Sequence, residues 1–267
     1  MYSETACAMA VRMAELGHVP TGALALSTLN RGTLLRKLKQ WGMHEVVRYA
    51  KAKLLPQIGH QRGRAAGNPY LDPLLKHEHG SFRSLREVAA GYGFPLAFCH
   101  DQNSSESIAH LQEWAPDLII FTGGNILRQQ VLDLPGLGVL NVHLALLPQI
   151  RGMSTPEWSL LNHVPVGITI HCMDAGIDTG PVLQRYELPE VARCESLSDL
   201  RNRLIAFGVE KTGDVVEGLV RGTISANPQS DTAPDNQFFV MHEWLQARAA
   251  ERLMANHRAP TTGAVHE

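Results

Sequence analysis

The chain has 267 residues, of which 44% are hydrophobic and 19% charged, as in an ordinary globular protein with a sizeable core. Its net charge of −2 excludes an overall field that recruits nucleic acid or an anionic membrane. Four scattered cysteines without a CxxC pair favour neither a zinc site nor a disulfide framework, so we expect free thiols and a cytoplasmic protein. No apolar run approaches the roughly 18 residues of a membrane span, and no secretion signal is expected.

The first predicted element is a helix in residues 3–19, which Ser3 caps and Gly17 ends. A short buried strand follows at residues 21–26. Residues 29–90 are basic and weakly helical, with nine Lys or Arg against one acid between Arg31 and Arg64. We interpret them as a helical insertion, because they hold too few apolar residues for a core of their own. Its basic part is either a solvated face or a contact for an anionic substrate group, such as a nucleotide diphosphate.

From Gly93 onwards, apolar strands alternate regularly with amphipathic helices, which predicts an α/β fold with a mostly parallel sheet and helices on both faces. Strands are expected at residues 94–99, 117–124, 138–143, 166–174 and 181–188, and helices at 104–116, 126–135, 154–163 and 195–222. Residues 1–222 then form the main domain. Residues 223–267 form an extension with one short helix and a polar tail.

Two polar side chains end the predicted strand at residues 138–143. Asn141 and His143 are two residues apart, so they point the same way on an extended backbone. Asp178 lies in a glycine-flanked loop after a strand expected to neighbour this one. An amide can donate to an oxyanion, an imidazole can move a proton, and a carboxylate can orient the imidazole. The alternative is that Asn141 and His143 only satisfy backbone groups at a strand end.

The stretch "NVHLALLPQIRG", followed by "GITIHCMDAGIDTGPVL", resembles the family of formyltransferases that use 10-formyltetrahydrofolate. The likeness is close over residues 117–188 and extends to the rest only as a pattern. It implies the Rossmann-like formyltransferase fold, a one-carbon transferase, and Asn141, His143 and Asp178 as the catalytic residues. By the resemblance, Asn141 and protonated His143 hold the oxyanion, and Asp178 directs a proton from the amine to N10 of the folate. No metal is implied.

Two loops are implied to form the folate pocket through their backbone groups. They contain Thr122, Gly123, Gly124, Asn125, Ile126 and Leu127, and Asp174, Ala175, Gly176 and Ile177. Arg151 and Gly152 are expected to shape the loop beyond the catalytic residues. Ala145 stands where the family frequently has serine, which predicts the loss of a hydroxyl on the substrate side. His171 is expected to be a packed or pocket-lining residue and not a second base.

The acceptor amine is not named by the sequence. We expect a small molecule, such as an amino sugar or an amino acid. The alternatives are methionyl-tRNA and a non-catalytic folate-binding relic. The tRNA-formylating branch of the family carries a C-terminal β-barrel, whereas mostly helical residues follow Asp178 here. The sequence therefore argues against tRNA as a partner. The oligomeric state is left open.

The start of the chain carries one more expectation. A doubly wound sheet normally begins with a strand, whereas here a helix comes first. We expect the first strand to be missing, so that either the true start lies upstream or the sheet has an exposed edge or a gap beside residues 21–26. Under the hypothesis of an N-terminal truncation, about ten upstream residues would raise the melting temperature by several degrees.

Overall fold

The computed structural model describes residues 3–27, 67–77, 80–230 and 234–256. The basic stretch from Arg31 to Arg64, and both interpretations of it, lie outside the described residues. Within the described ranges, no helix is both long enough and apolar enough to cross a membrane.

The amino-terminal elements follow the sequence pattern. Helix α1 (Glu4–Glu15) begins where the Ser3 hydroxyl accepts a hydrogen bond from the backbone N–H of Ala6, as the capping prediction requires. Strand β1 (Ala23–Leu26) follows and pairs in parallel with β4 (Leu96–Cys99). Both predicted elements are confirmed, although the residues of β1 are half-buried and not buried as expected.

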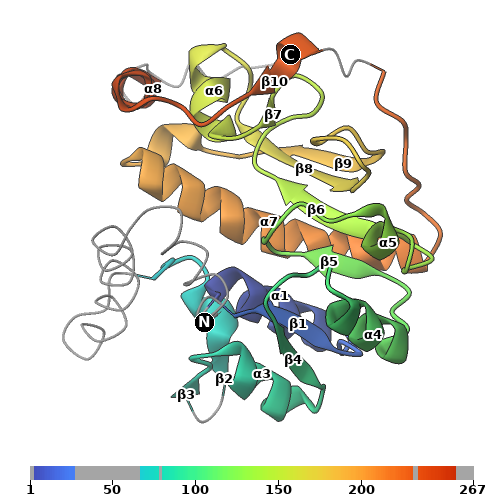
Figure 1. Cartoon of the computed structure of the whole chain (residues 1–267). Coiled ribbons are helices and arrows are strands. Elements are labelled where there is room, and N and C mark those ends of the chain that lie inside the picture. The colour runs from blue at the N-terminus through green and yellow to red at the C-terminus, as the bar shows by residue number, and fades with distance from the viewer. Residues whose placement is uncertain (1–2, 28–66, 78–79, 231–233, 257–267) are drawn as a thin grey trace, which may run out of the picture.

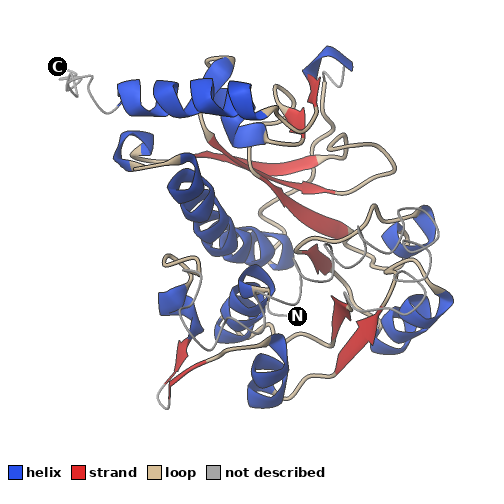
Figure 2. Ribbon diagram, turned by 60° about the vertical axis from the view of Figure 1, so that its left-hand side comes forward, coloured by secondary structure: helices blue, strands red, loops and turns tan. Residues whose placement is uncertain are grey.

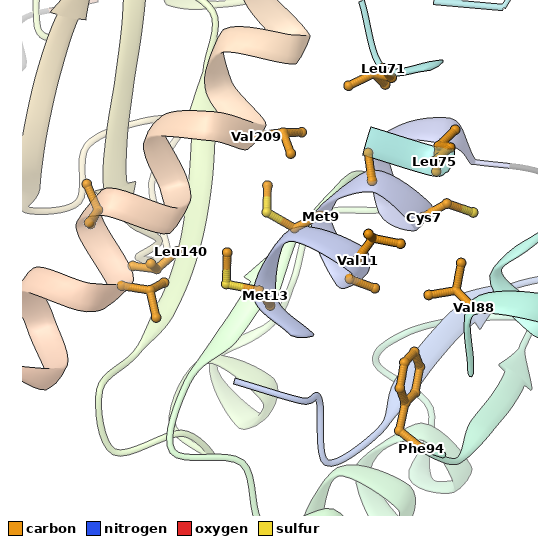
Figure 3. Close-up of a cluster of buried hydrophobic side chains, with 14 of the residues drawn as sticks. Cys7, Met9, Val11, Met13, Leu71, Leu75, Val88, Phe94, Leu140 and Val209 are labelled. Atoms are coloured by element: carbon orange, nitrogen blue, oxygen red, sulfur yellow. The ribbon is translucent and has the colours of Figure 1, made fainter. Parts of the chain in front are cut away.

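The described residues between Gly67 and Tyr92 lie between β1 and β4 in the chain and pack against α1. They form a 3₁₀ helix η1 (Asp72–Leu75), the short strands β2 (Lys76–His77) and β3 (Gly80–Ser81), and helix α3 (Leu85–Tyr92). Leu71, Leu75 and Val88 are fully or almost fully buried, in one cluster with Cys7 and Val11 of α1 (Figure 3). This part of the predicted insertion therefore packs into the main core.

A four-stranded sheet forms the second half of the molecule, in the order β5 (Ile119–Phe121), β6 (Val139–His143), β8 (Gly167–Cys172) and β9 (Val182–Glu187). β5 and β6 are parallel, whereas β8 is antiparallel to both β6 and β9. The predicted neighbour relation of β6 and β8 is confirmed. Their opposite direction adds an antiparallel edge to the parallel pair and changes how the loop after β8 reaches the site.

Helices cover both faces of this sheet, which confirms the predicted α/β fold (Figures 1 and 2). Alternating residues of β6 show this: Leu140 packs in the cluster of α1 and the long helix α7 (Leu197–Val220), whereas Val139 packs with α4 (Ser105–Trp114) and α5 (Gln129–Leu132). The remaining elements are α6 (Thr155–Leu161), η2 (Val191–Arg193), η3 (Pro234–Asn236), α8 (Glu243–Asn256) and the parallel pair β7 (Arg151–Gly152) and β10 (Gln237–Phe238). Helix α8 packs on α6.

The sheet is interrupted between β1 and β5. Among the described residues, the β1–β4 pair shares no ladder with the four-stranded sheet. A cleft of 370 Å³ separates the two groups, and its walls are mainly apolar side chains of α1, β1, α4, β5 and α7, including Met9, Met13, Leu24, Trp114, Ile120 and Leu219. Within the part of the chain that the structure describes, the sheet therefore has a gap beside β1.

Candidate active site

One face of the β6–β8 ladder is polar. Asn141 lies directly opposite His171, and His143 opposite Thr169, so all four side chains share a face. The intervening residues, among them Ile168 and Ile170, point the other way into the core against α7. The sequence alternation thus separates a packed face from a face that carries hydrogen-bonding groups.

Asp178 reaches this face through the loop that follows β8. Because β8 is antiparallel to β6, Cys172 lies beside Leu140, at the start of β6, and residues 173–181 must fold back towards His143. The left-handed backbone of Asp178 (φ +53°) helps to make this return. Its Oδ2 accepts a hydrogen bond from the backbone N–H of Gly152 at 2.8 Å, which fixes the carboxylate.

His143 lies between this carboxylate and a backbone carbonyl. Its Nε2 is 2.7 Å from the carbonyl oxygen of Ile150, and its Nδ1 is 3.4 Å from Oδ2 of Asp178. A carbonyl oxygen only accepts, so Nε2 carries a hydrogen. Nδ1 then donates towards Asp178 only when the ring is the imidazolium. Both N–H groups of that imidazolium are directed at protein acceptors.

His171 completes the cluster, although the sequence analysis gave it no catalytic part. Its Nε2 is 3.1 Å from Nδ2 of Asn141 and 3.6 Å from Oδ1 of Asp178, and its Nδ1 is 2.9 Å from the carbonyl oxygen of Cys172. The side chain is 2% exposed. Burial first, and then the positive charge of His143, lower the pKa of His171 despite the opposing effect of Asp178. The sequence could have indicated its position, because His171 is two residues after Thr169 and so lies on the same face of β8.

Arg151 and Gly152 support the loop that carries Asp178. Arg151 is buried, and its Nη1 donates to the carbonyl oxygen of Ile177 at 3.4 Å. Gly152 has φ +96°, and a Cβ there would lie 2.1 Å from the carbonyl oxygen of Phe238 in β10. Glycine is therefore required by both the backbone conformation and the close approach of β10.

The first predicted folate loop, Thr122–Leu127, follows β5 and is held by side chains from the loop after β4. Gln102 donates to the carbonyl oxygen of Gly123 and accepts from the backbone N–H of Asn125. Asn103 donates to the carbonyl oxygen of Ile126. The side chain of Ile126 is 77% exposed, whereas Leu127 is buried. The loop thus presents apolar surface and side-chain-free glycine backbone to the outside.

The second predicted folate loop, Asp174–Ile177, is ordered by its own aspartate. Oδ1 of Asp174 accepts from the backbone N–H of Gly176 and from the hydroxyl of Thr179. Met173, immediately before the loop, packs in the cluster that contains Leu127, so the two loops rest on one apolar base. Ile177 is 46% exposed. Each loop therefore exposes one isoleucine side chain.

Ala145 and the apolar cleft both lie close to the site residues. Ala145 is completely buried and its carbonyl oxygen accepts from the Thr169 hydroxyl, so the loss of a substrate-side hydroxyl stays a prediction. The 370 Å³ cleft is lined by Thr122, Gly123 and Leu127 but by none of Asn141, His143 and Asp178. It therefore borders the first folate loop and not the polar cluster.

The sequence was compared with families and proteins of known identity. The profile of the formyl transferase family matches residues 60–216. The methionyl-tRNA formyltransferases of Pelobacter propionicus and Geobacter sulfurreducens are 33% and 36% identical over 150 residues, which is 55% of this chain and 47% of each relative. The chain thus spans about half the length of these curated relatives. The crystal structure of glycinamide ribonucleotide transformylase 1 from Symbiobacterium toebii matches with a TM-score of 0.53 at 18% identity, over 86% of this chain and 91% of that one.

These relatives correct the expectation about tRNA. The argument against tRNA as a partner is contradicted, because the curated relatives are methionyl-tRNA formyltransferases. That argument used the overall charge and the helical residues after Asp178, whereas the family profile matches residues 60–216, which contain the site motifs.

The family itself is settled by the extent of the match. The profile covers more than half of the chain, and the matched range includes β6, β8 and the loop that carries Asp178. The one solved structure with a TM-score above 0.5 described above has the same fold. The chain therefore belongs to the formyl transferase family.

Proposed function

We propose that this chain transfers the formyl group of 10-formyltetrahydrofolate to a primary amine, with Asn141, His143 and Asp178 as the catalytic residues. The observation that carries the proposal is the convergence of these three side chains, from β6 and the loop after β8, on one polar face of the sheet. The folate is proposed to lie against the loops Thr122–Leu127 and Asp174–Ile177, whose exposed isoleucines offer apolar surface for its ring.

The proposed role of each residue follows from its hydrogen bonds. The bound co-substrate supplies an electrophilic formyl carbon, to which the neutral amine adds, and the bond from that carbon to N10 then breaks. Asn141 has one N–H that is not used by His171 and can donate it to the developing oxyanion. His143 as the imidazolium pairs with Asp178, and the carboxylate of Asp178 is the group that can accept the proton of the amine. The proton lost by the amine is finally carried by N10.

This assignment modifies the role expected for His143. Both of its ring nitrogens face protein acceptors, the carbonyl of Ile150 and the carboxylate of Asp178. Direct donation to the oxyanion is therefore assigned to Asn141 alone. His143 is proposed to act through charge and through the proton that it shares with Asp178.

The acceptor is proposed to be a small-molecule amine of the amino-sugar or amino-acid type. Methionyl-tRNA is the second candidate, and it is favoured by the curated relatives.

The test is a parallel assay of tetrahydrofolate release from 10-formyltetrahydrofolate with three kinds of acceptor: nucleotide-linked amino sugars, free amino acids, and methionyl-tRNA. Saturable release with one acceptor, lost in Asp178→Asn, supports formyl transfer and names the amine. Binding of the folate without release with any acceptor would instead support the folate-binding relic and refute the catalytic proposal.

A further inference from the structure

The ring of His171 has a definite tautomer, which follows from its partners. Nδ1 is 2.9 Å from the carbonyl oxygen of Cys172, and a carbonyl can only accept. Nδ1 therefore carries the hydrogen. In the neutral ring, Nε2 is then a bare lone pair that needs a donor.

Asn141 supplies that donor. Its side-chain nitrogen lies 3.1 Å from Nε2 of His171, directly across the β6–β8 ladder. An asparagine amide can rotate by half a turn and exchange its oxygen and nitrogen. Rotation here would place the amide oxygen against the Nε2 lone pair, two acceptors in contact within a site that is shielded from water. His171 thus distinguishes between the two orientations of the Asn141 amide.

The surroundings keep His171 neutral. Its side chain is 2% exposed, and the ring of His143 is 6.3 Å away between centroids. Burial first, and then repulsion by His143, lower the pKa of His171, whereas Asp178, 3.6 Å from Nε2, opposes them. A neutral ring whose lone pair is already occupied by Asn141 is not available as a second base.

We propose that His171 is a positioning residue, which accepts a hydrogen bond at Nε2 from Asn141 and so holds the amide with its second N–H facing the reacting group. This inference rests on the proposed function, because Asn141 needs a fixed N–H only if it stabilises an oxyanion. His171 itself touches neither the acceptor nor the folate in this role.

The kinetic test compares two variants of similar size. His171→Phe keeps a ring but removes both nitrogens, whereas His171→Gln keeps an acceptor oxygen near the position of Nε2. We expect His171→Phe to lower kcat about 10- to 100-fold, as for a misplaced catalytic group, with the KM for the folate little changed. His171→Gln should recover most of kcat. The double variant His171→Phe/Asn141→Ala should be no slower than Asn141→Ala alone, because the two residues act as one unit.

A second measurement does not depend on turnover. The ¹⁵N-labelled imidazole spectrum of the wild-type protein at neutral pH should show a histidine with protonated Nδ1 and bare Nε2, assigned by its loss in either His171 variant. The side-chain amide signal of Asn141 should move in the same variants.

The tautomer and the turnover rate each test the proposed role of His171. An imidazolium or an Nε2–H tautomer at His171 overturns the proposal even when His171→Phe fails to fold, and so does wild-type kcat in a folded His171→Phe variant. If no acceptor is formylated by the wild type, the proposed function fails, whereas the tautomer and the Asn141 signal still show whether His171 fixes the amide.

Discussion

Replacing Asp178 with asparagine removes one charge from the site with little change in shape. Oδ2 of Asp178 faces Nδ1 of His143 at 3.4 Å, and the two side chains are 15% and 5% exposed. At an effective dielectric constant of about 20, two unit charges at this separation attract each other by roughly 5 kcal/mol, which is an upper limit for what the substitution can remove. An asparagine can still accept the hydrogen bond of the Gly152 N–H through its oxygen, so the loop should keep its conformation.

The expected result is a fall in kcat of about 10²- to 10⁴-fold, equivalent to roughly 3–5 kcal/mol of activation free energy. Tetrahydrofolate release at saturating acceptor is the assay, and thermal unfolding checks that the fold is kept. The matched control is Asp174→Asn, since Asp174 orders the neighbouring loop but lies outside the catalytic cluster. Its effect should fall on the KM for the folate. A folded Asp178→Asn variant that turns over like the wild type would refute the reasoning.

Three further predictions concern Asn141, the Arg201–Glu157 ion pair and the cysteines. Asn141→Ala should lower kcat by about 10²- to 10³-fold with folate affinity nearly unchanged, which pre-steady-state kinetics and equilibrium binding would separate. Arg201→Ala should destabilise the protein by about 3 kcal/mol in urea unfolding, because Glu157, 3% exposed, would lose both charge-assisted hydrogen bonds; an unchanged midpoint would contradict this. The thiols of Cys7, Cys99, Cys172 and Cys194 should react slowly with iodoacetamide at pH 8 in the folded protein and quickly in denaturant. Burial raises their pKa values, to about 12 for Cys7, and the reactive thiolate is scarce below the raised pKa. Fast labelling of the native protein would count against this.

Local elements could be predicted from the sequence because their signals are local. The cap at Ser3, the period of the apolar residues in α1, and the alternation in β6 each lie within a few neighbouring residues. The candidate residues Asn141 and His143 come from the same kind of signal, and their common face is a consequence of strand geometry. The placement of Asp178 beside His143 was expected from the motif and is found in the structure.

The part of the site that could not be predicted depends on direction and register. Apolar alternation does not state whether β8 runs with or against β6, and that direction decides that His171 lies opposite Asn141. On sequence grounds, a histidine in an apolar strand is a packed residue. Only the pairing shows that its Nε2 meets the amide of Asn141.

The interruption between β1 and β5 bears on how the molecule opens. Among the described residues, the β1–β4 pair is joined to the four-stranded sheet by side-chain packing and not by a ladder. Helix α1 packs closely against α7. A Cβ at Gly213 would lie 2.8 Å from Leu16, and His18, just after α1, contacts Glu217 of α7 at 2.8 Å. As far as the described strands go, separating the two groups therefore breaks no inter-strand hydrogen bond.

Native-state hydrogen exchange should then resolve two cooperative units. The amides of β6 and β8 should exchange only through global unfolding, whereas those that β1 shares with β4 should exchange through a smaller, sub-global opening. Gln102 and Asn103 follow β4 and hold the loop Thr122–Leu127, so this opening would release one proposed wall of the folate site while Asn141, His143 and His171 stay in place. Folate affinity and the sub-global opening free energy would consequently be linked, with saturating folate slowing exchange in β1 and β4 more than in β8.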